Sequence, residues 1–99
     1  MKTDEDISLI LSGIRALHGE ITPVLRSASI ELRNKKIIFK CVFDENATDD
    51  DFELVSVAAA EILADFPHYD LEEIYERVCE PVSTNPLENI LYHRHEGNY

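Results

Sequence analysis

The strongest constraint on the fold is an alternation of apolar and polar residues over positions 27–43, interrupted once. Ala28, Ile30 and Leu32 alternate with polar residues, and a second alternating run follows Asn34-Lys35. This period of two is typical of strands with one buried face. Asn tolerates the left-handed first position of a tight turn, whereas Lys at the second position is less usual and leaves a longer turn open. A two-residue turn predicts an antiparallel hairpin whose apolar face pairs Leu32 with Ile37, Ile30 with Phe39 and Ala28 with Cys41.

A helix is expected before the hairpin. Thr3 is a suitable N-cap, and acidic residues at 4–6 favour the positive end of the helix dipole. Gly19 stands where a helix commonly ends in a left-handed glycine. The residues that recur at helical spacing form one apolar stripe on this helix; they are Ile7, Ile10, Leu11, Ile14 and Leu17.

A second helix is expected after a polar loop at 44–50. Thr48 and Asp51 form a short capping box, and Pro67 ends the element. The body from Phe52 to Phe66 is apolar over most of its circumference, which predicts a largely buried, central helix.

The C-terminal third is less well determined by its pattern. Residues 70–79 suit either a helical stripe or a strand, residues 82–87 suggest a loop, and a short final strand is expected over 90–94.

At 99 residues with 44% hydrophobic content, the chain has enough apolar surface for one core, so we expect a single domain over 1–99. The N-terminal sequence does not resemble a signal peptide and cysteines are few, which favours a cytoplasmic protein with reduced thiols.

Charge excludes two classes of partner. The chain has 20 acidic and 9 basic residues, a net charge of −11, which disfavours direct binding to nucleic acid or to an anionic membrane. Residues 44–80 hold 13 acidic residues and one basic residue, a local charge of −12. This acidic block is either a solvated face or a docking surface for a basic partner. Tyr69 and Tyr75 lie inside it, either as binding anchors or as half-buried structural residues.

The sequence contains no catalytic signature. It has no phosphate-binding glycine loop and no metal motif built from its four histidines and two cysteines. His93 and His95 would share a face on a strand, which leaves a small metal-binding protein or enzyme as an alternative. Cys41 belongs to the apolar face of the hairpin and is expected to be a core thiol.

Three segments resemble one family. The run Leu17-His18-Gly19-Glu20-Ile21-Thr22-Pro23-Val24-Leu25-Arg26, the segment Ala64-Asp65-Phe66-Pro67 and the segment Tyr92-His93-Arg94-His95-Glu96 are similar to immunity proteins of contact-dependent growth inhibition and related polymorphic toxin systems. The resemblance implies an α+β fold in the order helix, two strands, helix, two strands, and it favours a strand at 71–79. We expect the four strands to form an antiparallel sheet with the helices packed on it. Asn85-Pro86-Leu87-Glu88-Asn89 replaces the glycine turn that members often have before the last strand.

The resemblance and the charge together predict a non-catalytic inhibitor without a cofactor. Its expected partner is a cognate toxin domain, a nuclease with a basic active face. Arg94 and Glu96 are expected to have structural roles. Pairing of copies through an exposed sheet edge is a third hypothesis. The candidate toxin-contact residues are Asp44, Glu45, Asp49, Asp50, Asp51, Glu53, Tyr69, Asp70, Glu72, Glu73, Tyr75 and Glu76.

Overall fold

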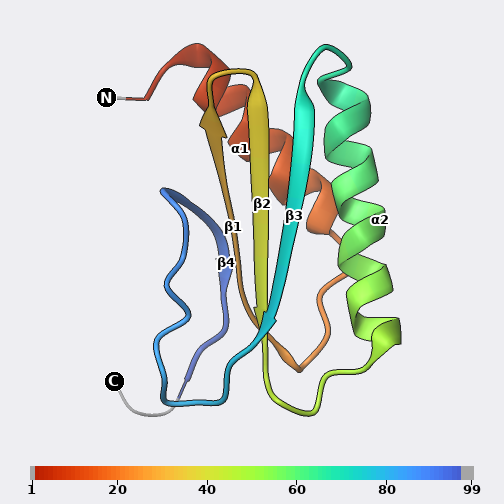
Figure 1. Ribbon diagram of the computed structural model, residues 1–99, viewed down its shortest axis with the longest axis vertical. Coiled ribbons are helices and arrows are strands. Elements are labelled where there is room, and N and C mark those ends of the chain that lie inside the picture. The colour runs from red at the N-terminus through yellow and green to blue at the C-terminus, as the bar shows by residue number, and fades with distance from the viewer. Residues whose placement is uncertain (1, 97–99) are drawn as a thin grey trace.

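The computed structural model describes residues 2–96 as two layers, a sheet and a pair of helices (Figure 1). The elements in chain order are α1 (Asp4–Leu17), β1 (Leu25–Arg33), β2 (Lys36–Phe43), α2 (Asp49–Asp65), β3 (Asp70–Arg77) and β4 (Asn89–His93). The predicted α+β class and order of elements are confirmed, and the segment expected as a strand over 71–79 forms β3, which spans Asp70–Arg77. No helix within residues 2–96 combines the length and the apolar character needed to cross a membrane.

The β1–β2 hairpin has the predicted register. Leu32 pairs with Ile37, Ile30 with Phe39 and Ala28 with Cys41. Asn34 takes the left-handed conformation at φ 57°, but Lys35 does not, so the tight turn places no unusual demand on the lysine.

The expectation of a fully antiparallel sheet is wrong. The strand order is β3-β2-β1-β4, and β3 runs parallel to β2. The reason is the connection over residues 44–69, because α2 carries the chain back along the sheet to the end where β2 began. A parallel neighbour needs such a crossover, and a helix usually provides it.

The apolar stripe of α1 does not face the core, except at Leu17. The side chains of Ile7, Leu11 and Ile14 are 47%, 57% and 50% exposed, and Ile10 is half-buried. The helix instead turns mainly small residues inward, so that its axis lies close to the sheet. At Gly13 a Cβ atom would lie only 2.6 Å from Cδ1 of Leu91. The buried residues of α1 are Leu9, Ser12, Gly13, Ala16 and Leu17.

Helix α2 is buried on one side only. Val55, Ala58, Ala59 and Ile62 face the core, whereas Leu54, Val57 and Leu63 remain 36–49% exposed. The expectation of a helix buried over most of its circumference is therefore wrong. Because α2 packs at the β3 side of the sheet and α1 beside it, both helices keep a face that no described element covers.

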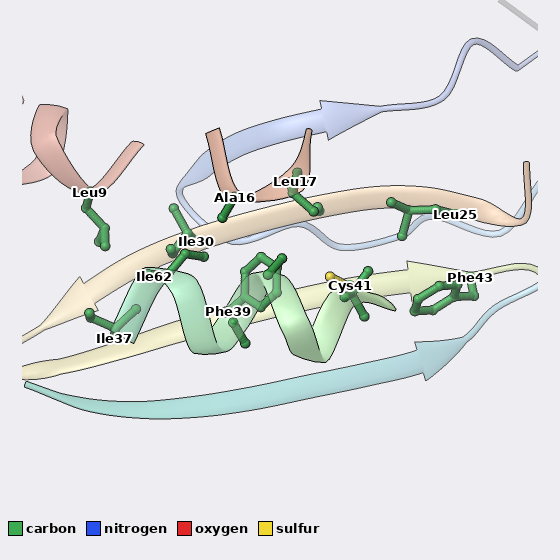
Figure 2. Close-up of a cluster of buried hydrophobic side chains, with 14 of the residues drawn as sticks. Leu9, Ala16, Leu17, Leu25, Ile30, Ile37, Phe39, Cys41, Phe43 and Ile62 are labelled. Carbon is green, nitrogen blue, oxygen red and sulfur yellow. The ribbon is translucent and has the colours of Figure 1, made fainter. Parts of the chain in front are cut away.

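The core lies between the two layers (Figure 2). Side chains from one face of the hairpin, including Ile30, Phe39 and Cys41, meet Leu17 of α1 and Ile62 of α2. Cys41 is fully buried, as expected, and burial raises the pKa of its thiol.

The other face of the sheet is partly covered by the connection from β3 to β4. Lys40 Nζ donates to the Asn85 carbonyl at 2.7 Å, and the Leu87 amide donates to Ser29 Oγ at 2.9 Å. These contacts satisfy polar groups that would otherwise be buried without partners. Asn85 has φ 47°, so it adopts the left-handed conformation, which asparagine tolerates better than most residues.

The chain turns after α1 at Gly19, whose left-handed backbone can be tested by substitution. It has φ +86°, and an added Cβ would meet no atom within 4 Å, so only backbone strain opposes a side chain there. We expect Gly19→Ala to lower the free energy of unfolding by about 1 kcal/mol in urea denaturation. Ser8→Ala, at an exposed position of α1, should change it by less than about 0.5 kcal/mol. Equal effects of the two substitutions would contradict the claim that the left-handed backbone at Gly19 disfavours a side chain.

Candidate functional site

Six of the candidate residues gather at one end of the molecule, where β2 ends and α2 begins (Figure 1). We call this group the acidic end; it comprises Asp44, Glu45, Asp49, Asp50, Asp51 and Glu53. The first turn of α2 positions three of them, because carboxylates there are stabilised by the helix dipole.

Four carboxylates of the acidic end project into solvent. Glu45, Asp49, Asp50 and Glu53 are exposed, and within residues 2–96 no Lys or Arg approaches them within 4.0 Å. Their charges are therefore available to a partner without the loss of an internal ion pair.

The fifth carboxylate, Asp51, is used by the fold. Its Oδ2 accepts hydrogen bonds from the Thr48 amide at 2.8 Å and from the Thr48 hydroxyl at 3.1 Å. These bonds, chiefly the backbone one, lower the pKa of Asp51. The predicted capping interaction is thus present at the start of α2.

A network of ion pairs connects the acidic end to neighbouring segments of the chain. Arg94 reaches Asp44 at 2.5 Å, and Glu80 and Glu96 at 3.0 Å each. It also donates to the Pro23 carbonyl at 2.9 Å. The network joins the start of β1, the β2–α2 loop, the β3–β4 connection and the segment after β4, which confirms the structural roles expected for Arg94 and Glu96.

Arg26 is the buried anchor of this network. Its side chain is only 2% exposed, and its Nε and Nη2 atoms donate to the two Glu96 oxygens at 2.8 and 2.9 Å. Nη1 donates to the Val78 carbonyl at 2.8 Å. Such a bidentate pair fixes geometry as well as charge. Sequence reasoning missed this pair because its members lie 70 positions apart.

The ion pairs of Glu96 lower the pKa of its carboxyl group. Hydrogen bonds from Arg26, with further help from Arg94, lower the pKa of Glu96 from 4.5 to about 2. A carboxyl whose pKa falls on folding stabilises the fold fully above its unfolded value, and this contribution is lost as the pH falls through the folded value.

We therefore expect Glu96→Gln to remove part of the pH dependence of stability between about pH 5 and pH 2. Urea denaturation of both proteins across that range measures it: the wild type should lose more of its free energy of unfolding on acidification. Parallel pH profiles would contradict the role of Glu96.

A shallow hollow of about 310 Å³ opens beside the acidic end. It is lined by Asp44, Glu45, Asn46, Cys79 and Glu80, so its walls are mainly acidic and amide groups. Glu80 was not among the predicted contact residues, although it belongs to the acidic block of the sequence.

The candidates on β3 do not join the acidic end as one free surface. Glu72 pairs with Lys36 at 2.6 Å and Glu76 with Lys40 at 3.6 Å, across the parallel strands. Asp70 lies at the start of β3, the opposite end of the sheet from the first turn of α2. The acidic block of residues 44–80 therefore divides into the acidic end and a set of cross-strand pairs.

The two tyrosines hold elements together. Tyr75 is half-buried and stacks on Phe52 of α2 with ring centroids 6.0 Å apart, and its hydroxyl donates to Glu73. Burial raises the pKa of this tyrosine. The Tyr69 hydroxyl donates to Glu5 of α1, and its ring packs edge-on against Phe66.

The histidine alternative gains no support from the geometry. In the part of the chain that the structure describes, no group of three or more His, Cys, Asp or Glu side chains could hold a metal ion. His93 is exposed, and its Nδ1 lies 2.8 Å from the Arg94 carbonyl.

These features define a small α+β protein with an acidic surface that a network of ion pairs connects to the sheet. A family model described as "MafI2 immunity protein" matches residues 6–96, which is most of the chain. The chain therefore belongs to the MafI2 immunity protein family, and the resemblance to immunity proteins is confirmed. No match was found among the curated proteins.

Proposed function

We propose that the protein neutralises a cognate toxin by covering the toxin's basic face with the acidic end, and that the toxin is a nuclease. Membership of an immunity family supports a toxin partner. The observation that carries the choice of surface is a group of four exposed carboxylates that form no ion pair with Lys or Arg among residues 2–96: Glu45, Asp49, Asp50 and Glu53.

Electrostatics favours this arrangement. A nuclease must present cations to the phosphates of its substrate, and an acidic partner is attracted to the same cations. Complementary fields raise the rate of association and disfavour wrong partners. The carboxylates project from a capped helix and a loop that Arg94 ties to the sheet, so little ordering is needed on binding.

The proposed toxin contact includes fewer residues than the twelve candidates from the sequence. Its centre is Glu45, Asp49, Asp50 and Glu53, with Asp44, Asp51 and Glu80 behind them. Tyr69, Asp70, Glu72, Glu73, Tyr75 and Glu76 are outside the centre, because all except Asp70 already have intramolecular partners. We place the inhibition in the cytoplasm, where a nuclease finds its substrate.

The test uses the toxin domain encoded beside this gene. Its nucleic-acid cleavage should fall to zero as the protein is titrated to one equivalent, because the inhibitor acts by stoichiometric binding. Full inhibition at far less than one equivalent would indicate catalysis and contradict the mechanism. A bound toxin domain without nuclease activity would remove the proposed substrate class and leave the toxin partner in place.

A further inference from the structure

We propose that the free edge of β3 pairs with an extended strand of the toxin, next to the acidic end; this inference rests on the proposed function. The sheet order β3-β2-β1-β4 leaves β3 and β4 as its two edges. Backbone N–H and C=O groups along an edge strand form a template on which a second chain can add a strand.

Alternate residues of β3 direct their backbone groups away from the sheet. The Asp70 amide donates to the Lys35 carbonyl at 3.0 Å, and the Val78 amide donates to the Phe43 carbonyl at 2.8 Å. Because the hydrogen-bonding direction alternates along a strand, the even-numbered residues of β3 face β2 and the odd-numbered residues face outward. Within residues 2–96, the structure shows no hydrogen bond to the outward backbone groups, which are those of Leu71, Glu73, Tyr75 and Arg77.

The two edges of the sheet differ in how well they are protected from pairing. β4 has five residues, and its pairing with β1 contains a register shift. Short strands and bulges are features that keep an edge from pairing with another chain. β3 has eight residues, pairs with β2 without a register shift and contains no proline. The β3 edge is therefore the better template for an added strand.

Helix α2 lies beside the β3 edge and offers an added strand a second contact. Ser56 Oγ donates to Glu73 Oε1 at 3.1 Å, so this side of α2 faces β3. Leu63 follows Ser56 by seven residues and therefore lies on the same side of the helix, where it remains 37% exposed. A toxin strand that carries apolar side chains toward α2 would cover Leu63.

The end of β3 lies next to the acidic end. Arg77, the last residue of β3, donates from Nε to the Ala47 carbonyl at 3.1 Å, and its guanidinium carbon lies 4.5 Å from the centroid of the Phe52 ring. Ala47 belongs to the loop after β2 and Phe52 to the first turn of α2, which are the segments that carry the acidic end (Figure 1). A toxin bound at the acidic end can therefore reach the last residues of the β3 edge.

Charge favours the toxin over a second copy of this chain as the occupant. The chain has a net charge of −11, so two copies repel each other. Among residues 2–96, no Lys or Arg lies within 4.0 Å of the Glu73 carboxylate, which accepts hydrogen bonds from the neutral hydroxyls of Ser56 and Tyr75. A basic residue in the toxin strand would pair with Glu73, whereas a second β3 brings four acidic residues and one basic residue.

Amide hydrogen exchange measured by NMR on the full chain, free and saturated with the toxin domain, tests the pairing residue by residue. In the free protein, the inward amides of β3 should exchange slowly and the outward amides quickly. Besides any slowing in residues 44–53, saturation should slow the exchange of Glu73, Tyr75 and Arg77 at least about tenfold, because their N–H groups gain acceptors.

A proline at an outward position tests the same contact through affinity. Glu73→Pro removes an N–H group that the fold does not use, and it should weaken toxin binding at least about tenfold. Glu73→Ala is the matched control, because it removes the same side chain and keeps the amide; its affinity should stay within about threefold of the wild type. Circular dichroism checks the fold of both variants, and if Glu73→Pro does not fold, the exchange experiment on the wild type decides.

Unchanged exchange at the outward amides, together with slowed exchange in residues 44–53, would overturn the strand pairing and leave the proposed function intact. Equal affinities of the two folded Glu73 variants would overturn the pairing as well. Outward amides that are already protected in the free protein at millimolar concentration would overturn it in favour of a second copy. A toxin domain that does not bind the chain at all would contradict the proposed function, and this inference with it.

Discussion

Replacing Arg26 with methionine is expected to lower the free energy of unfolding by about 3 kcal/mol. The substitution removes both hydrogen bonds to Glu96 and the bond to the Val78 carbonyl. Glu96, which is only 11% exposed, then keeps its charge with Arg94 as its remaining ion-pair partner among the described residues. Removing one member of a buried pair is costly because the other charge stays away from water.

Thermal or urea denaturation measures this effect. A loss of about 3 kcal/mol corresponds to a fall in Tm of roughly 12–24 °C for a domain of this size. Arg33→Met is the matched control: Arg33 also pairs with a glutamate, Glu31, but its side chain is 66% exposed. Because exposed pairs contribute little, the control should lose less than about 1 kcal/mol. Similar losses in both variants would show that Arg26 is not the anchor described here.

The second large effect concerns binding. Combining Glu45→Gln, Asp49→Asn, Asp50→Asn and Glu53→Gln should weaken toxin binding by about 100-fold, since each charge contributes somewhat under 1 kcal/mol at an interface. The loss should appear largely in the association rate, and the salt dependence of affinity should decrease. Asp51 is left unchanged because it caps α2. Calorimetry and stopped-flow kinetics with the toxin domain measure these quantities.

The control for this variant removes the same number of charges elsewhere. Glu20→Gln, Glu61→Gln, Asp70→Asn and Glu88→Gln lie outside the acidic end, and none of their carboxylates has an ion-pair partner within residues 2–96. This variant should keep the affinity within about threefold of the wild type, because screening limits the reach of distant surface charges. An equal loss in both variants would assign the effect to net charge and contradict a specific site.

Local patterns in the sequence were sufficient for the hairpin and the helix starts. The register of β1 against β2 follows from alternation and a two-residue turn, both read within 17 residues. Thr3 and Thr48 stand at the predicted N-caps because capping is a contact between residues three apart. The direction of β3 needed information beyond local pattern, because a run of strand-forming residues is compatible with either orientation.

The face of α1 shows why periodicity alone was insufficient. Leu9, Ser12, Gly13 and Ala16 have helical spacing just as Ile7, Leu11 and Ile14 have. Hydrophobicity alone would favour burial of the large side chains. The short distance between helix and sheet instead requires small residues on the buried face, with Gly13 against Leu91. That distance is a property of tertiary packing.

The segments that suggested the family have a structural explanation. Arg26 is the last residue of the first segment, and Glu96 is the last residue of the third. These two residues form the buried ion pair of the network that connects to the acidic end. Pro23 of the first segment also accepts a hydrogen bond from Arg94 of the last. The resemblance therefore rests on residues that hold the fold together. The proposed contacts Glu45, Asp49, Asp50 and Glu53 lie outside all three segments.

Part of the candidate site could be located from charge alone. The acidic block over 44–80 includes the acidic end, but it also includes Glu72 and Glu76, which the parallel pairing of β3 with β2 neutralises through Lys36 and Lys40. Without the strand direction, free and paired carboxylates could not be separated. Tyr75 illustrates the same limit, because its stacking on Phe52 depends on the position of α2 beside β3.

Amide hydrogen exchange of the protein with and without its toxin domain locates the toxin-binding surface. If the acidic end binds the toxin, slowed exchange on binding concentrates in residues 44–53, the loop after β2 and the first turn of α2, with little change in the exposed face of α1. Protection confined to α1, or to the outer edges of β3 and β4, with residues 44–53 unchanged would contradict binding through the acidic end.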